Sequence, residues 1–137
     1  LQTTGGGVTV RSNAVAGGAV WEWLWNGVQF INDYDYGRQM QAALFWGESD
    51  PDVWANPTEA GDGHSAQAQS GLRHGSPILS FYNVTPSHAR TRCVPLEWTP
   101  SLHGGSETQP VVWRDIVLGK DLVLNFNNMG PVAQYVT

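Results

Sequence analysis

One segment in the first third of the chain mixes hydrogen-bonding and aromatic side chains in a way that suits sugar binding. In the stretch NDYDYGRQMQAALFW, residues 32–46, the polar residues Arg38, Gln39 and Gln41 stand between aromatic residues. A guanidinium offers a rigid fork of donors, and an amide both donates and accepts, so this set matches sugar hydroxyls. A local alternative is an ion pair between Arg38 and one of the two aspartates that precede it.

A second candidate lies in the run NPTEAGDGHS, which begins at Asn56. Glu59 in this glycine-flanked loop has the chemistry of a general acid or base, with Asp62 or His64 as its partner. Paired carboxylates hydrolyse glycosides when they are held a few ångströms apart across the bond, a geometry that sequence neighbours rarely reach. The alternatives are that Asn56 and Glu59 contact a ligand without catalysis, or that the run is only a turn.

Tryptophan is abundant, with seven residues in a chain of 137. An indole ring stacks on the C–H face of a sugar, and it also fills the core of a β-protein. Four tryptophans are candidate stacking platforms: Trp46, Trp54, Trp98 and Trp113. Trp54 is preferred because it lies in the loop-like region 47–77, and Trp46 is the second choice.

Composition excludes several classes of function. The formal net charge is −5, with one lysine and six arginines, so the chain lacks the basic surface of a nucleic-acid binder or of a protein drawn to anionic membranes. It also lacks an apolar run of about 18 residues and a signal-peptide pattern at its start. We expect no nucleic-acid partner and no membrane partner. Because the candidate residues suit sugar binding, we expect a secreted or extracellular protein.

Metal and thiol chemistry find little support in the sequence. The four histidines are scattered, and they form none of the closely spaced pairs that ligate zinc. We therefore expect neither a metal nor another cofactor. Cys93 is the one cysteine, and it is interpreted as a small buried hydrophobe rather than a catalytic thiol.

The elements that must position these residues are predicted to be strands. Alternation begins at Val8, and AVWEWLW, Asn26-Gly27 and VQFIND predict a hairpin over residues 19–32, with Trp21, Trp23 and Trp25 on one face. Further strands are predicted at 38–46, 78–84, 90–98, 111–119, 121–128 and 132–137. The fold class is therefore all-β, an antiparallel sandwich with little or no helix, in one domain over residues 1–137.

The last predicted strand, within VAQYVT, is β-prone and has no stop signal. An unpaired edge of this kind attracts another strand. We expect either further chain or a second copy in a homo-oligomer to cover it.

Four segments, taken in order, resemble a known family. NGVQFINDYDYGRQMQAALFW, NPTEAGDGHS, GSPILSF and LVLNFNNMGPVAQYVT are similar to the opening half of galactose-mutarotase-like β-supersandwich domains, in particular the bacterial carbohydrate-associated members. The resemblance implies an antiparallel supersandwich with a concave sugar-binding face, lined here by Arg38, Gln39, Gln41, Asn56 and Glu59. The catalytic carboxylate of the mutarotases lies in the later half of the fold, so the resemblance does not imply mutarotase activity.

Together these features predict a lectin-like carbohydrate-binding module. Trp54 or Trp46 would stack on the sugar, while the Arg, Gln and Glu side chains bind its hydroxyls. The alternatives are a carbohydrate-active lyase or hydrolase that uses Glu59 and His64, and a structural protein that assembles through its C-terminal edge strand.

Overall fold

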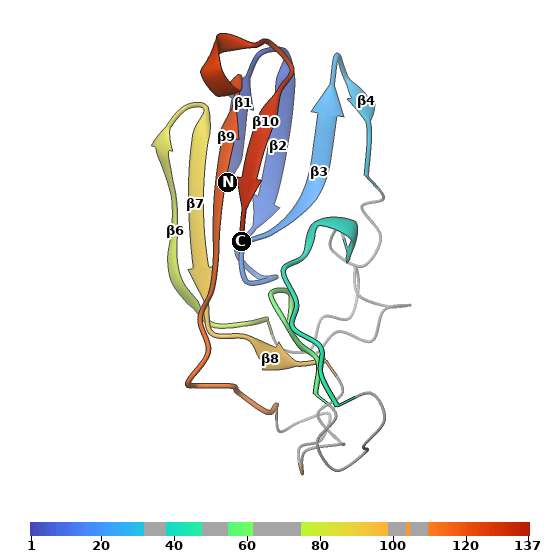
Figure 1. Ribbon diagram of the computed structural model, residues 1–137, viewed down its shortest axis with the longest axis vertical. Coiled ribbons are helices and arrows are strands. Elements are labelled where there is room, and N and C mark those ends of the chain that lie inside the picture. Colours follow the sequence, from blue (N-terminus) through green and yellow to red (C-terminus); the bar gives the residue numbers. More distant parts are fainter. Residues whose placement is uncertain (32–37, 48–54, 62–74, 99–103, 105–109) are drawn as a thin grey trace.

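The chain forms an all-β fold of antiparallel sheets, as the sequence predicts. The computed structural model describes residues 1–31, 38–47, 55–61, 75–98, 104 and 110–137. The first sheet has the order β1-β2-β3-β4, and the second has the order β10-β9-β7-β6 (Figure 1). The strands of the first are β1 (Gln2–Gly5), β2 (Val8–Asn13), β3 (Ala19–Trp25) and β4 (Val28–Gln29). Those of the second are β6 (Ile78–Thr85), β7 (His88–Cys93), β9 (Leu118–Leu124) and β10 (Ala133–Val136).

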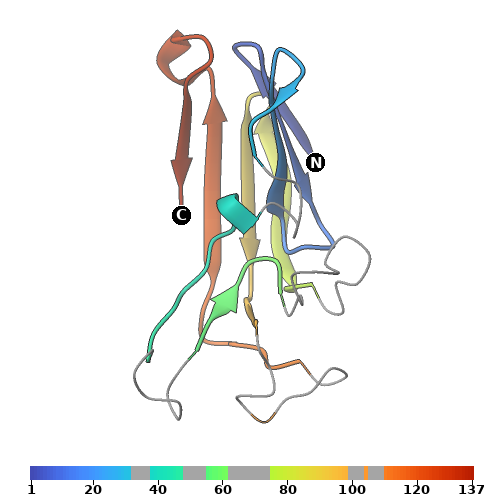
Figure 2. The same cartoon turned by 90° about the vertical axis from the view of Figure 1, so that its right-hand side faces the viewer.

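A short third sheet pairs β5 (Pro57–Thr58) with β8 (Leu96–Glu97), and it lies at one end of the two larger sheets. At the opposite end are the β1–β2 and β3–β4 turns and the short 3₁₀ helix η5 (Phe126–Asn128), as both views show (Figures 1 and 2). Within the described residues, no helix is both long enough and apolar enough to span a membrane.

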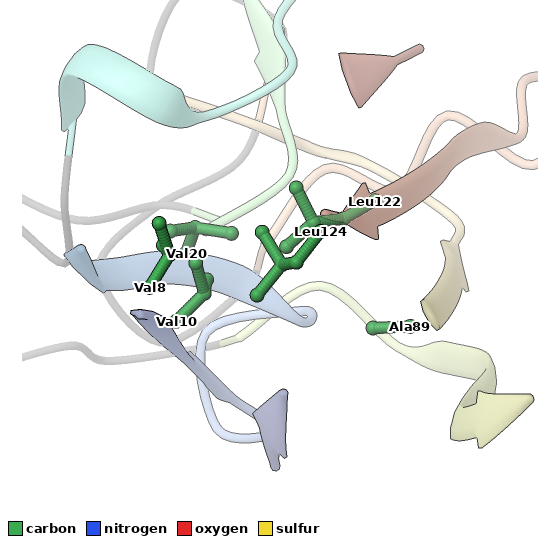
Figure 3. Packing of buried hydrophobic residues seen from close by; sticks show 6 residues of the cluster. All are labelled: Val8, Val10, Val20, Ala89, Leu122 and Leu124. Atoms are coloured by element: carbon green, nitrogen blue, oxygen red, sulfur yellow. The ribbon is translucent and has the colours of Figure 1, made fainter. Parts of the chain in front are cut away.

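The core lies between the two larger sheets and follows the period-two pattern of their strands. Along β2 buried and half-buried residues alternate, so that Val8 and Val10 point inward. They face Leu122 and Leu124 of the second sheet, and all four are at most 3% exposed (Figure 3). Burying such aliphatic side chains stabilises a fold by roughly 1.5–3 kcal/mol each.

The predicted hairpin forms, with Asn26 (φ 48°) and Gly27 (φ 80°) both in the left-handed region that a tight hairpin turn requires. Its return strand is shorter than predicted, because β4 ends at Gln29. The predicted tryptophan face is wrong in one respect. The pairing moves from Arg11–Glu22 to Ser12–Val20, so Trp21 is the extra residue of a β-bulge. The bulge turns both Val20 and Trp23 toward the core.

Two further predicted strands have different boundaries in the structure. Residues 38–46 are not a continuous strand, because the 3₁₀ helix η2 (Arg38–Met40) opens the segment and only isolated bridges follow. Residues 90–98 divide into β7 and β8, which belong to different sheets and are separated by Val94 and by Pro95, which has no N–H to donate.

The largest error concerns residues 111–128, predicted as two strands joined at Gly119-Lys120-Asp121. Instead β9 runs straight through this tripeptide, and Lys120 pairs with Thr91 of β7. The turn-like composition is overridden because Lys120 has buried partners, which are described below.

Backbone contacts lock the turns at the η5 end of the molecule. A Cβ atom on Gly6, which has φ +59°, would lie 1.9 Å from the carbonyl oxygen of Gly130. The β1–β2 turn therefore packs directly on the connection that leads into β10.

We expect Gly6→Ala to lower the free energy of unfolding by about 3 kcal/mol, since it adds a backbone clash to the cost of a left-handed alanine. Gly27→Ala is the matched control. Gly27 has a similar φ of +80° but no atom within 4 Å of the added Cβ, so its loss should be only about 1–2 kcal/mol. Urea unfolding of both variants measures the difference, and equal losses would show that the Gly6–Gly130 contact is unimportant.

Candidate functional site

Four extended segments pair side by side at the β5/β8 end and form a small platform (Figure 2). Residues 41–47 pair with residues 55–59 through Leu44 N–H to Pro57 O (3.0 Å) and Glu59 N–H to Ala42 O (2.8 Å). β5 pairs with β8, and Glu97 N–H of β8 donates to Val111 O at 2.9 Å. Because neighbouring side chains of an extended segment point to opposite sides, the platform has two distinct faces.

One face of the platform carries a pocket of about 290 Å³ that is both polar and aromatic. Its described lining is Gln41, Ala43, Phe45, Asn56, Thr58 and Trp98. Gln41, Ala43 and Phe45 are spaced by two residues, as side chains on one face of an extended segment are. Trp98 was one of the four candidate stacking tryptophans. Phe45 was not a predicted site residue, although extending the spacing of Gln41 and Ala43 by two residues identifies it.

The other face carries a buried ion pair between Glu59 and Lys120. Both side chains are only 3% exposed. Lys120 Nζ also donates to the Gly18 carbonyl at 2.8 Å, and Glu59 Oε2 accepts from the Ala42 N–H at 3.1 Å. The expectation that Glu59 lines an open sugar-binding face is therefore corrected, because its carboxylate is enclosed and bound within the protein.

A second buried carboxylate, Glu97, holds the segments of the platform together. It is 0% exposed, and its oxygens accept from the Asn56 N–H at 3.0 and 3.1 Å. Glu97 Oε2 also accepts from the indole N–H of Trp113 at 3.0 Å. Glu97 is not predictable from the sequence, because a lone glutamate between two apolar residues carries no distinctive motif.

Trp46 lies apart from the pocket. Its ring packs edge-on against Trp113, with centroids 5.1 Å apart and an interplanar angle of 77°. The backbone bridges Trp46–Ala55 and Ala43–Thr58 belong to the same antiparallel pairing. Trp46 is an odd number of residues from Ala43, so its side chain points to the opposite face. Trp46 and Glu59 are therefore on the side opposite Gln41 and Asn56, and the predicted single binding surface is divided into two.

The remaining predicted site residues are placed only in part. Gln39 is exposed within η2, whose first residue is Arg38. Trp54, Asp62 and His64 lie outside the described residues. Among the residues that the structure does describe, no group of three or more His, Cys, Asp or Glu side chains could hold a metal ion.

A separate polar cluster joins β7 to β9 across the outer face of their sheet. Asp121 Oδ1 lies 2.7 Å from His88 Nε2 and accepts from Arg90 Nε at 2.9 Å. The hydrogen bond from Arg90, followed by that from His88, lowers the pKa of Asp121. Since Asp121 is 35% exposed, this cluster is a partly solvated cross-strand contact.

No protein-family model, curated protein or solved structure matches this chain. The resemblance to galactose-mutarotase-like domains therefore stays a prediction.

Replacing Lys120 by methionine should lower the free energy of unfolding by roughly 3–5 kcal/mol, because it leaves the Glu59 carboxylate buried without its cation. The double variant Lys120→Met, Glu59→Gln removes that unpaired charge and should recover much of the loss. Urea unfolding of the two single variants and the double variant measures the coupling. Additive losses in the double variant would contradict this account of the pair.

Cys93 is 1% exposed, as the sequence analysis expected of a small buried hydrophobe, and burial raises the pKa of its thiol to about 12. A thiol attacks disulfide reagents only as the thiolate, so the folded protein should hold Cys93 unreactive at neutral and mildly alkaline pH. Labelling with an aromatic disulfide should proceed only as fast as the protein opens, and at full rate in denaturant. Rapid labelling of the folded protein would show that Cys93 is accessible.

Proposed function

We propose that this protein is a carbohydrate-binding β-sandwich module whose binding site is the pocket on the platform. The observation that carries the proposal is the convergence of two amides, Gln41 and Asn56, with two aromatic rings, Phe45 and Trp98, around one cavity. Phe45 is 52% exposed, so much of the residue is at the surface beside the cavity.

The chemistry of this lining suits a sugar ring. A pyranose presents apolar C–H faces, which pack on aromatic rings, and hydroxyls at its rim, which pair with amides that donate and accept. A volume of about 290 Å³ is at the small end for ligand pockets, so it fits one sugar residue of a glycan better than a long segment.

The site favours binding over turnover. Glu59, the predicted acid or base, is enclosed with Lys120, and the six described lining residues include no acid, histidine or cysteine. A lyase or hydrolase would need its acid and base from outside the described residues, where Asp62 and His64 lie. The proposal therefore needs no cofactor and includes a secreted or extracellular location, where glycans are accessible.

A second candidate function is assembly through β10. This strand is at the edge of its sheet, its four residues include no charged side chain, and Val136 is 51% exposed. Charged edge residues are one common protection against strand addition, and β10 lacks them.

We expect a glycan array to identify a bound carbohydrate, and titration calorimetry with that carbohydrate to show binding without product formation. Trp98→Ala and Phe45→Ala should each weaken binding by about tenfold or more, the usual effect of losing an aromatic anchor. Trp25→Ala, tested with a single-sugar ligand that occupies one pocket, is the matched control, because Trp25 is also a half-exposed tryptophan but lies at the η5 end.

An equal loss in Trp25→Ala, or a bound glycan whose affinity does not change in the two pocket variants, would place the site elsewhere. Release of a product from the glycan would favour the enzyme alternative.

A further inference from the structure

The end of the molecule opposite the platform carries no charged side chain in any of the segments that build it. Residues 1–10, 23–31, 82–87 and 122–137 include no Asp, Glu, Lys, Arg or His. These segments contain the β1–β2, β3–β4 and β6–β7 turns and the β9–β10 connection (Figures 1 and 2). We call this surface the uncharged end.

Backbone contacts make the uncharged end a preformed surface. Thr4 N–H donates to Pro86 O at 2.9 Å, and Leu124 N–H donates to Ser87 O at 2.8 Å. The close approach of Gly6 to Gly130 joins the β1–β2 turn to the β9–β10 connection. A partner would therefore meet a surface that needs little ordering on binding.

Large apolar side chains are exposed on this surface. Met129 is 62% exposed, Val28 60% and Phe30 58%. Single exposed hydrophobic residues are ordinary, but a group of them on converging turns without charges between them marks an interaction site.

The uncharged end also has a pocket of about 210 Å³, lined by Val8, Trp23, Trp25, Phe30 and Pro131. The rings of Trp25 and Phe30 form one wall, with centroids 6.0 Å apart and an interplanar angle of 50°. An apolar cavity of about 150 Å³ holds a benzene ring, so this one has room for one large apolar side chain. Met129, two residues from Pro131, is such a side chain on the same surface.

We propose that the uncharged end binds a second copy of this chain, as a symmetric dimer in which Met129 of each copy enters the aromatic pocket of the other. In a twofold interface the same surface must supply both the protruding group and the hollow that receives it. Met129 and the Trp25–Phe30 pocket meet that requirement, and a flexible thioether packs well against aromatic rings.

The charge distribution favours a second copy over a lipid surface. Two copies that each carry a formal charge of −5 repel, and contact through the uncharged end keeps their charged side chains away from the interface. The same net charge disfavours an anionic bilayer, and a bilayer has no protruding side chain for the pocket.

Sedimentation velocity of the whole chain, from micromolar to millimolar concentration, tests the proposal. We expect a monomer–dimer equilibrium that persists at high salt, because apolar contacts are not screened. Met129→Ala should raise the dimer dissociation constant by about tenfold, and Met129→Asp and Phe30→Asp should abolish the dimer, because each brings like charges together in a desolvated contact.

Leu79→Asp is the matched control. Leu79 is also 58% exposed, but it lies at the far end of β6 from the uncharged end, so the dimer should persist. Circular dichroism and thermal unfolding confirm that each variant is folded, and the two Asp variants test the same contact from its two sides.

Several results would overturn the proposal. One such result is a monomer at every concentration. Another is a dimer that is abolished by Val136→Asp in β10 but remains intact in Met129→Asp. Co-sedimentation of a monomeric chain with phosphatidylcholine vesicles, lost in Phe30→Asp, would identify the uncharged end as a lipid-binding surface instead.

Discussion

The buried ion pair of Lys120 and Glu59 is the interaction on which the arrangement of the molecule depends. Lys120 belongs to β9 of the larger sandwich, Glu59 follows β5 of the platform, and the Gly18 carbonyl that also binds Lys120 precedes β3. Removing two charges from water costs several kcal/mol per ion, and only close pairing with further hydrogen bonds compensates for that cost. The pair is therefore satisfied in one relative placement of β9, the platform and the β2–β3 connection, which makes it a determinant of geometry more than a source of stability.

Strand positions were predictable where local signals and packing agree. The alternation of Val8 and Val10, the Asn26-Gly27 turn and the strand within VAQYVT all appear in the structure. Prediction failed where a distant partner decides the conformation. Nothing near Gly119-Lys120-Asp121 in sequence shows that Lys120 has Glu59 as a partner, 61 residues away, so a composition typical of turns became the middle of a strand. Trp21 is a similar case, because a bulge depends on the pairing of β2 with β3 and not on the alternation within β3 alone.

The candidate site was predictable by residue type but not by face. Gln41 and Asn56 were both predicted to contact a sugar, and both line the pocket. Glu59 and Trp46 have equally suitable chemistry, yet their backbone phase turns them to the other side. The face that each side chain occupies depends on which residues of 41–47 pair with which residues of 55–59. The sequence of either segment alone does not show this pairing. Glu97 shows the same limit, because its role in binding Asn56 and Trp113 emerges only when three segments meet.

The platform pocket and the aromatic pocket lie at opposite ends of the sandwich, and their linings differ in chemistry. The platform pocket combines amides with aromatic rings, whereas the described lining of the pocket at the uncharged end consists of aliphatic and aromatic side chains. A dimer formed through the uncharged end would leave both platform pockets open and directed away from the interface. Two weak single-sugar sites held at a fixed separation bind a polyvalent glycan far more tightly than either site alone, without any new contact to sugar. A pocket of about 290 Å³ that holds one sugar residue would then be sufficient for a binding module, because the avidity comes from the assembly.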